Sequence, residues 1–198
     1  MAEFWSYFEN GIWHIFNIFA CHHILFLTVL TVPYVLKDWK KLLVLISLFT
    51  LGNLLALALS VYGVIIIKGK LISLLIPTII FLIALFNLFS GKLSKPLNVN
   101  VVGFVTLTFG VLHGLDISNL FNSLSKSSNQ TKFLSIAEFS LGVEAAQAIV
   151  VFLVLLFTYV CQTFLRFSKR DCTLVLSSFV IGVVLPIIMK NEIWDRLH

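Results

Sequence analysis

The chain alternates between long apolar runs and short polar breaks, and this pattern predicts membrane-spanning helices. A spanning helix needs about 20 mainly apolar residues, and six runs come close to or exceed that length. The breaks between them carry lysine, arginine, serine and asparagine. We therefore predict an all-α polytopic transmembrane helical bundle of about six helices, in a single integral membrane domain over 1–198. The predicted spans are 18–36, 42–67, 71–90, 99–121, 133–165 and 172–189.

The amino-terminal segment has a different pattern from the runs that follow it. Large apolar residues recur there at helical spacing, with polar residues between them, at Phe4, Trp5, Phe8, Ile12, Ile15 and Phe16. Aromatic side chains on one face of a short helix are typical of helices that lie in the membrane interface. The pattern predicts an N-terminal interfacial amphipathic helix that leads into the first span.

Composition supports the membrane class and excludes others. Hydrophobic residues make up 59% of the chain and charged residues 12%, with a mean hydropathy of +1.03. A soluble domain needs more charge than this to cover its surface. The net charge of +5 is spread over several loops, so it does not predict a nucleic-acid-binding face. Three widely separated cysteines form no CxxC pair, which argues against a disulfide framework or a structural zinc site.

The distribution of basic residues predicts an orientation. The first, third and fifth loops hold eight lysines and arginines, whereas the termini and the other two loops hold six. Because cytoplasmic loops carry the excess of basic residues, both termini are predicted to lie outside the cytoplasm. The first ten residues contain no lysine or arginine, so we expect no cleavable signal peptide.

A few ionisable residues lie inside or at the ends of the apolar runs, and they are the main functional signal. Polar groups in hydrocarbon cost free energy unless they are paired, so such residues indicate a functional site. Imidazole and carboxylate groups bind divalent metals or relay protons. The residues concerned are His14, His22, His23, His113, Asp116, Glu138 and Glu144.

The fourth run holds a histidine and a carboxylate on one helix face. His113 and Asp116 are three residues apart, so they can form a ligand pair, or a ligand and its hydrogen-bond acceptor. Gly110 and Gly114 allow another helix to approach closely beside them. The alternative interpretation is a glycine packing seam that contains one hydrogen-bonded histidine.

The fifth and second runs add further polar candidates. Glu144 and Gln147 share a face, whereas Glu138 lies nearer the start of its run, where a headgroup position is an alternative. Asn53 in the second run is explained equally well by an interhelical hydrogen bond and by a ligand role.

The first run contributes the remaining histidines. His22 and His23 are adjacent, so in a continuous helix only one of them is expected to point inward. A break around 17–20 would bring His14 nearer to the pair. Plain interfacial polarity is the alternative for this pair.

At these residues the chain resembles the HupE/UreJ family of hydrogenase- and urease-accessory membrane proteins. Five pieces match in the family's order and together span most of the chain. They are Gly-Ile-Trp-His at 11–14, His-Ile-Leu-Phe-Leu at 23–27, Leu-Phe-Thr-Leu-Gly at 48–52, Phe-Gly-Val-Leu-His-Gly at 109–114 and Gly-Val-Glu-Ala-Ala-Gln at 142–147.

The resemblance implies a nickel or cobalt permease in a bacterial inner membrane that supplies metal to hydrogenase or urease. The family's hallmark is a histidine followed by an Asp-His pair. His14 and His23 match the two histidines, whereas His22 stands where the family has aspartate. Asn53 stands where close relatives carry histidine. Both departures change the donor atoms, and the first also removes a negative charge.

The sequence thus predicts a non-enzymatic permease for a divalent transition-metal ion, Ni²⁺ or Co²⁺ first. Its partners are the lipid bilayer and the transported ion, with no permanently bound cofactor and no nucleic acid. A homo-oligomer is left open. The alternatives are an intramembrane metalloenzyme and a non-transporting membrane scaffold. The predicted metal ligands are His14, His22, His23, His113, Asp116, Glu144, Gln147 and Asn53.

Overall fold

The structure, a computed structural model, describes residues 2–17, 21–65, 69–90, 99–124 and 131–191. In these ranges the chain is helical and contains no strand, which confirms the predicted all-α bundle. The helices are α1 (Ala2–Phe16), α2 (His22–Thr31), the short 3₁₀ helix η2 (Leu36–Asp38), α3 (Trp39–Val61), α4 (Gly69–Ser90), α5 (Val99–Leu124), α6 (Lys132–Thr163) and α7 (Lys169–Met189).

Five of these helices, α3 to α7, are long and apolar enough to cross a membrane. They coincide with the last five predicted spans to within a few residues, except that α3 ends at Val61 and not at 67. Gly63 follows in a left-handed conformation with φ of 76°, which glycine adopts without steric cost and which ends the helix.

The predicted first span, 18–36, is the main difference from the sequence-based prediction. Its helix α2 has only ten residues and ends shortly before Pro33. Proline has no N–H to donate to the carbonyl of Val29, so the helical hydrogen-bond pattern stops there. The Nδ2 atom of Asn87 on α4 donates to that carbonyl over 2.8 Å, so the buried backbone group is satisfied by another helix. Non-helical backbone at membrane depth is tolerated where protein surrounds it in this way.

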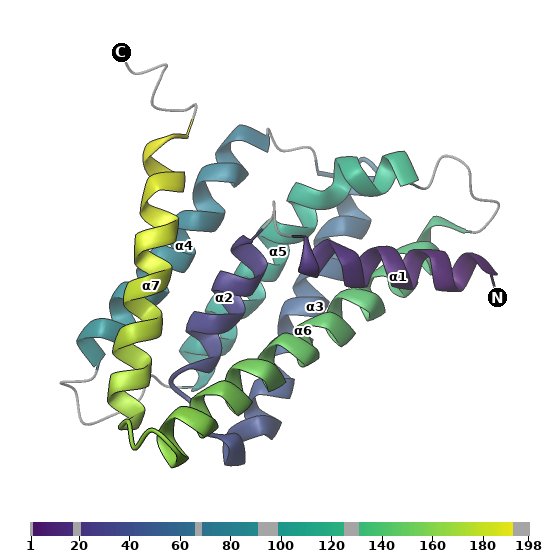
Figure 1. Cartoon of the computed structure of the whole chain (residues 1–198). Helices are drawn as coiled ribbons and strands as arrows, with labels where there is room; N and C mark the ends of the chain where they lie inside the picture. Colours follow the sequence, from purple (N-terminus) through teal and green to yellow (C-terminus); the bar gives the residue numbers. More distant parts are fainter. Residues whose placement is uncertain (1, 18–20, 66–68, 91–98, 125–130, 192–198) are drawn as a thin grey trace.

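Helix α1 has the predicted amphipathic character. Figure 1 shows it lying across the bundle, in a direction different from that of α7. Its outer face carries Trp5, Glu9 and Trp13, whereas Tyr7 and Ile15 are buried. Polar groups mixed with tryptophan on the outer face suit a headgroup region.

Two helix contacts are unusually close because glycines line them. A Cβ atom at Gly142 of α6 would fall on the carbonyl oxygen of Phe8 in α1, and one at Gly110 of α5 would fall on that of Phe49 in α3. Such small-residue contacts let helix backbones approach where lipid provides no hydrophobic driving force. They fix α1 on α6 and α5 on α3.

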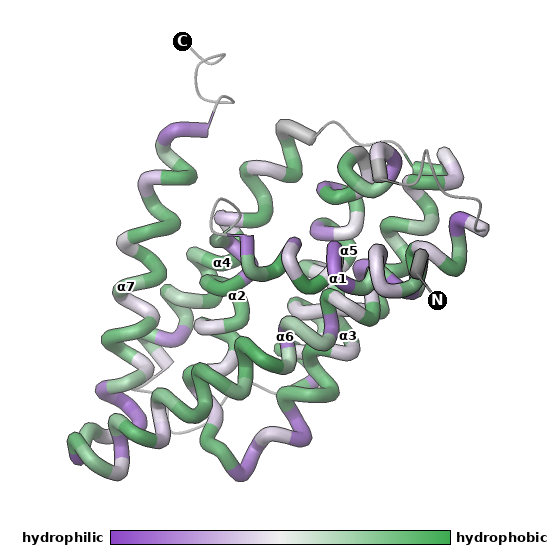
Figure 2. Tube along the Cα trace, turned by 45° about the vertical axis from the view of Figure 1, so that its right-hand side comes forward, coloured by the Kyte–Doolittle hydropathy of each residue, from purple (hydrophilic) through white to green (hydrophobic). Residues whose placement is uncertain are grey.

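The polar residues of the bundle gather at helix ends. Figure 1 shows the starts of α3 and α7 and the end of α6 at the lower end of the molecule, and Figure 2 shows hydrophilic residues there. We call this the basic end, since its described residues include Lys37, Lys40, Lys41, Arg166, Lys169 and Arg170. The helix flanks between the ends expose many large apolar side chains, as a surface in contact with lipid acyl chains requires.

Candidate metal centre

Three histidines from three helices meet inside the bundle. Each of His14 on α1, His23 on α2 and His113 on α5 offers one ring nitrogen that lies within 4.8 Å of the other two. His23 Nε2 and His113 Nδ1 are 3.3 Å apart, so one ring donates and the other accepts in a hydrogen bond between neutral imidazoles. We call these three residues the histidine cluster.

The histidine cluster is screened from solvent. His113 has no exposed surface and His23 is 2% exposed. The Nε2 atoms of His14 and His113 are buried and have no hydrogen-bond partner among the described residues. Buried polar atoms are normally paired, so unpartnered nitrogens that converge on one place indicate a position for a ligand.

The protonation state of His14 suits cation binding. Burial, and then the neighbouring His22, lower the pKa of His14 to about 4. Its ring is therefore neutral at neutral pH and offers a lone pair, which is the form of imidazole that binds metal. Metal–nitrogen bonds of about 2.0–2.1 Å place two ligand nitrogens at most about 4.2 Å apart, so small shifts would close these three around one ion.

The position of the histidine cluster follows from the breaks and contacts described above. His14 lies in the last turn of α1, which the α1–α6 contact holds, and His23 lies at the start of α2. Residue Asn17 between these helices is not helical, so the predicted break in this region is present. His113 follows Gly110 by one turn, where α5 packs against α3.

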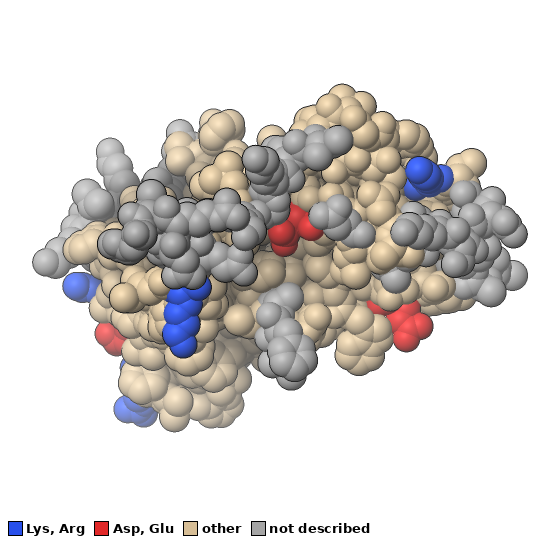
Figure 3. All heavy atoms as spheres, turned by 90° about the horizontal axis from the view of Figure 1, so that it is seen from above, with Lys and Arg blue, Asp and Glu red and all other residues tan. Residues whose placement is uncertain are grey.

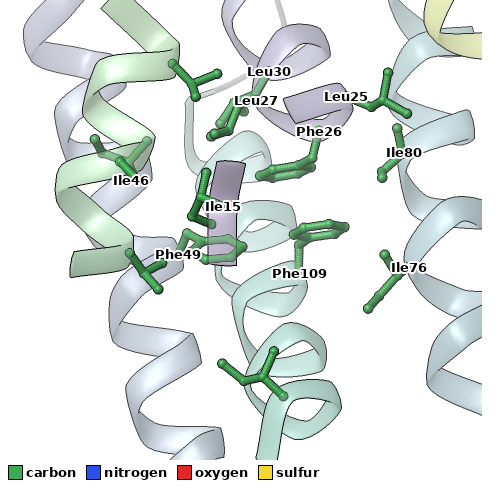
Figure 4. Packing of buried hydrophobic residues seen from close by; sticks show 14 of the residues in the cluster. Ile15, Leu25, Phe26, Leu27, Leu30, Ile46, Phe49, Ile76, Ile80 and Phe109 are labelled. Carbon is green, nitrogen blue, oxygen red and sulfur yellow. The ribbon is translucent and has the colours of Figure 1, made fainter. Parts of the chain in front are cut away.

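An aromatic layer closes the histidine cluster on the side of the basic end. Phe26 is one turn beyond His23, and Phe109 is one turn before His113. Their rings are stacked, with centroids 3.8 Å apart and an interplanar angle of 4°. Phe49 of α3 lies beside both rings, and all three side chains are buried, as Figure 4 shows. We call these three residues the phenylalanine layer.

Comparison with known proteins gives the family. A family model described as HupE / UreJ protein matches residues 1–191, nearly the whole chain. The chain belongs to the HupE/UreJ family. No curated protein and no solved structure matches it. Together with the five long apolar helices, membership makes the chain an integral membrane protein of a hydrogenase- and urease-accessory family.

His22 and Asn53, the two residues at which the resemblance implied a departure from the family pattern, both lie beside the histidine cluster. The His22 ring packs on that of His23 with centroids 4.0 Å apart and lies 6.3 Å from that of His113. Both adjacent histidines thus reach the interior, although a continuous helix would have turned one of them away. His22 starts α2, where helix geometry does not yet constrain it.

Asn53 is the second of these two residues, and its side-chain amide has no hydrogen-bond partner among the described residues. The residue has no exposed surface, and neither amide atom makes a hydrogen bond among the described residues. Its backbone carbonyl lies against Gly114, next to His113. One turn earlier on α3, the Phe49 ring lies 5.3 Å from that of His113. An interhelical hydrogen bond, the alternative considered for Asn53, is not formed by its side chain.

The structure does not gather the predicted carboxylates into the histidine cluster. Glu144 is half-buried, and its Oε1 atom accepts a hydrogen bond of 2.6 Å from Ser47 of α3. Asp116 is half-buried one turn beyond His113, and neither carboxylate belongs to the group of converging ligand atoms within the described part of the chain. Glu138 is buried on α6.

One predicted ligand remains to be placed, and two further features of this region had no usable signal in the sequence. Gln147, a predicted ligand, is buried, and its Oε1 atom has no hydrogen-bond partner among the described residues, as a ligand candidate would require. Ser47 and the phenylalanine layer were not predicted. Serine and phenylalanine are common in membrane helices, so only the three-dimensional contacts distinguish these residues from their neighbours.

Proposed function

We propose that this HupE/UreJ protein is a permease for a divalent transition-metal ion and that the histidine cluster is the binding site for the transported ion. The observation that carries the proposal is the convergence of three imidazoles, two buried and one half-buried, from three helices, with unpartnered Nε2 atoms on two of them. An ionisable group inside a membrane domain is costly unless it has a function or a partner.

The depth of the histidine cluster supports a transport role. Helix α2 rises ten residues from near the basic end to His22, which corresponds to about 15 Å of helix. The hydrocarbon core of a bilayer is about 30 Å thick, so with the basic end at one edge of the core the cluster would lie toward its middle. Binding sites of transporters characteristically lie near this depth. Helix α1 covers the cluster on the side away from the basic end, where the basic-residue bias predicts the outside.

The ligand set favours an exchangeable transition metal. Imidazole suits nickel, cobalt, copper and zinc, and family membership favours nickel or cobalt among them. The group of converging ligands includes no carboxylate, so an incoming dication keeps its full charge. Moderate affinity follows, and a permease needs it because its ligands must also release the ion.

Uptake of radioactive nickel and cobalt into cells tests the proposal. Cells that produce the wild-type chain should accumulate one of these ions, and His113→Ala and His23→Ala should reduce the accumulation at least tenfold. Ser47→Ala is the matched control, since it changes an exposed polar contact between α3 and α6 that lies outside the histidine cluster. All variants are compared at equal protein level in the membrane.

The same experiment separates the two other function classes. Accumulation that is unchanged by both histidine substitutions, for every divalent ion tried, would contradict the permease and favour a scaffold. Metal that co-purifies at a fixed ratio without any uptake would contradict it as well and favour an intramembrane metalloenzyme.

A further inference from the structure

A second feature of the bundle lies on the other side of the phenylalanine layer from the histidine cluster. A cavity of about 570 Å³ opens between α2, α4 and α5 in the half of the molecule near the basic end. Its walls are largely aliphatic and aromatic, and its rim includes the exposed side chains of Leu82 and Phe104. We call it the lower groove. An opening flanked by exposed apolar side chains faces the acyl chains of the bilayer.

The lower groove is not suited to metal ions. Two lysines, Lys41 and Lys169, line it together with a single carboxylate, Asp38. The phenylalanine layer separates it from the histidine cluster, and no histidine lines it. A cation would be repelled by the two lysines and would find few polar partners on the apolar wall. The groove is therefore suited to a ligand other than a metal ion.

The charged residues of the groove lie at one end of it. Tyr34 follows α2, Asp38 and Lys41 lie at the start of α3, and Lys169 begins α7, all at the basic end. Lys41 Nζ lies 2.8 Å from an oxygen of Asp38, which holds the ammonium at the groove mouth with two N–H groups still available. That is the sole ion pair among the described residues; Lys169 forms none there, although its charge also acts on the Asp38 carboxylate.

The protein surface around the charged end of the groove is also positively charged. Among the described residues, the basic end carries six lysines and arginines against two carboxylates, Asp38 and Asp171. The Asp171 carboxylate is engaged in capping α7, where it accepts hydrogen bonds from the backbone N–H and hydroxyl of Ser168. Figure 3, which looks onto the opposite end, shows only a few charged side chains among the described residues of that face, and they stand apart from one another.

We propose that the lower groove holds one anionic phospholipid. Its acyl chain would lie along Leu30, Ile83 and Val102, and its phosphate would sit at Lys41 and Lys169. Apolar walls with cations at one end match an amphiphile of this charge, and basic pockets between membrane helices on the cytoplasmic side bind such headgroups. The proposal is independent of whether the protein transports metal, since it uses no residue of the histidine cluster.

Native mass spectrometry of the purified full-length protein tests this inference. The protein in detergent receives equal amounts of phosphatidylglycerol and phosphatidylcholine, and the retained lipid is counted per chain. We expect one phosphatidylglycerol to be retained in preference. Each of Lys41→Ala and Lys169→Ala should weaken this binding about fivefold, which is the usual contribution of one lysine near an anionic lipid surface.

The control for charge is Lys190→Ala, which removes a lysine at the opposite end of α7. Equal retention of the two lipids, or equal loss in Lys190→Ala and Lys169→Ala, would overturn the proposal.

A second variant tests the groove separately from its charges. Val102→Trp fills the groove from α5, and Val102 is only partly buried, so the bundle should tolerate the larger side chain. We expect phosphatidylglycerol retention to be lost although both lysines remain. Retention at the wild-type level in this variant would place the lipid elsewhere and contradict the inference.

Discussion

The histidine cluster and the lower groove are built from the same helices and have opposite chemistry. Helix α2 contributes His23 to the first and Leu30 to the second, and α5 contributes His113 and Val102. The cluster offers imidazole nitrogens in the bundle interior, whereas the groove offers an apolar wall with lysines at its mouth. The phenylalanine layer lies between them. The same two helices therefore present different chemical groups at different positions along their length.

The largest effect, a loss of metal binding, is expected from Gly142→Leu. Because a side chain here would overlap the Phe8 backbone, α1 must leave α6 and take His14 with it. We expect metal binding to be lost and lipid retention in the lower groove to persist. Isothermal titration with Ni²⁺ or Co²⁺, and native mass spectrometry, measure the two. Gly182→Leu on α7 is the matched control, since a Cβ there meets nothing within 4 Å. Equal metal affinity in the two variants would contradict a role for the α1–α6 contact in placing His14.

The next effect is expected from Phe109→Ala, which removes the centre of the phenylalanine layer. Deleting a fully buried phenylalanine costs about 3–5 kcal/mol through lost packing and the cavity left behind. The thermal midpoint in detergent should fall accordingly. Phe104→Ala is the control, because this side chain on the same helix is 70% exposed toward lipid. Equal thermal midpoints in the two variants would contradict the close packing of the phenylalanine layer.

Asn53→Leu is expected to separate binding from stability. The amide of Asn53 is buried without a partner, so an apolar side chain of similar size should leave the thermal midpoint unchanged or raise it. If Asn53 contacts the bound ion, directly or through a ligand, metal affinity should fall about tenfold. Isothermal titration with Ni²⁺ or Co²⁺ measures it. Unchanged affinity would limit the site to the histidines.

The smallest effect is expected from Ser47→Ala. The substitution removes the hydrogen bond between Ser47 and Glu144, and interhelical hydrogen bonds in membranes contribute about 0.6 kcal/mol on average. We expect a slightly lower thermal midpoint with metal uptake unchanged. A loss of uptake comparable to that of His113→Ala would instead return Glu144 to the transport path, as the sequence first predicted.

Most of the fold could be predicted from the sequence because the long apolar runs and their charged boundaries are local features. Helices α4 and α5 begin or end where the runs do, since charged lysine side chains at the run boundaries are costly in hydrocarbon. The short helix α2 was not predictable in this way. Its run looks long enough to span, but Pro33 shortens the helix and Asn87, 58 residues away, satisfies the freed carbonyl.

The sequence by itself determined that this is an all-α membrane protein with imidazoles in apolar surroundings, because composition and periodicity are properties of neighbouring residues. Tertiary structure alone decided which of the predicted ligands meet. His23 and His113 are ninety residues apart and become neighbours through helix packing. The same packing turns Glu144 toward Ser47 and leaves Asn53 beside the histidines. Contacts between distant segments depend on how helices cross, and local patterns do not encode that geometry.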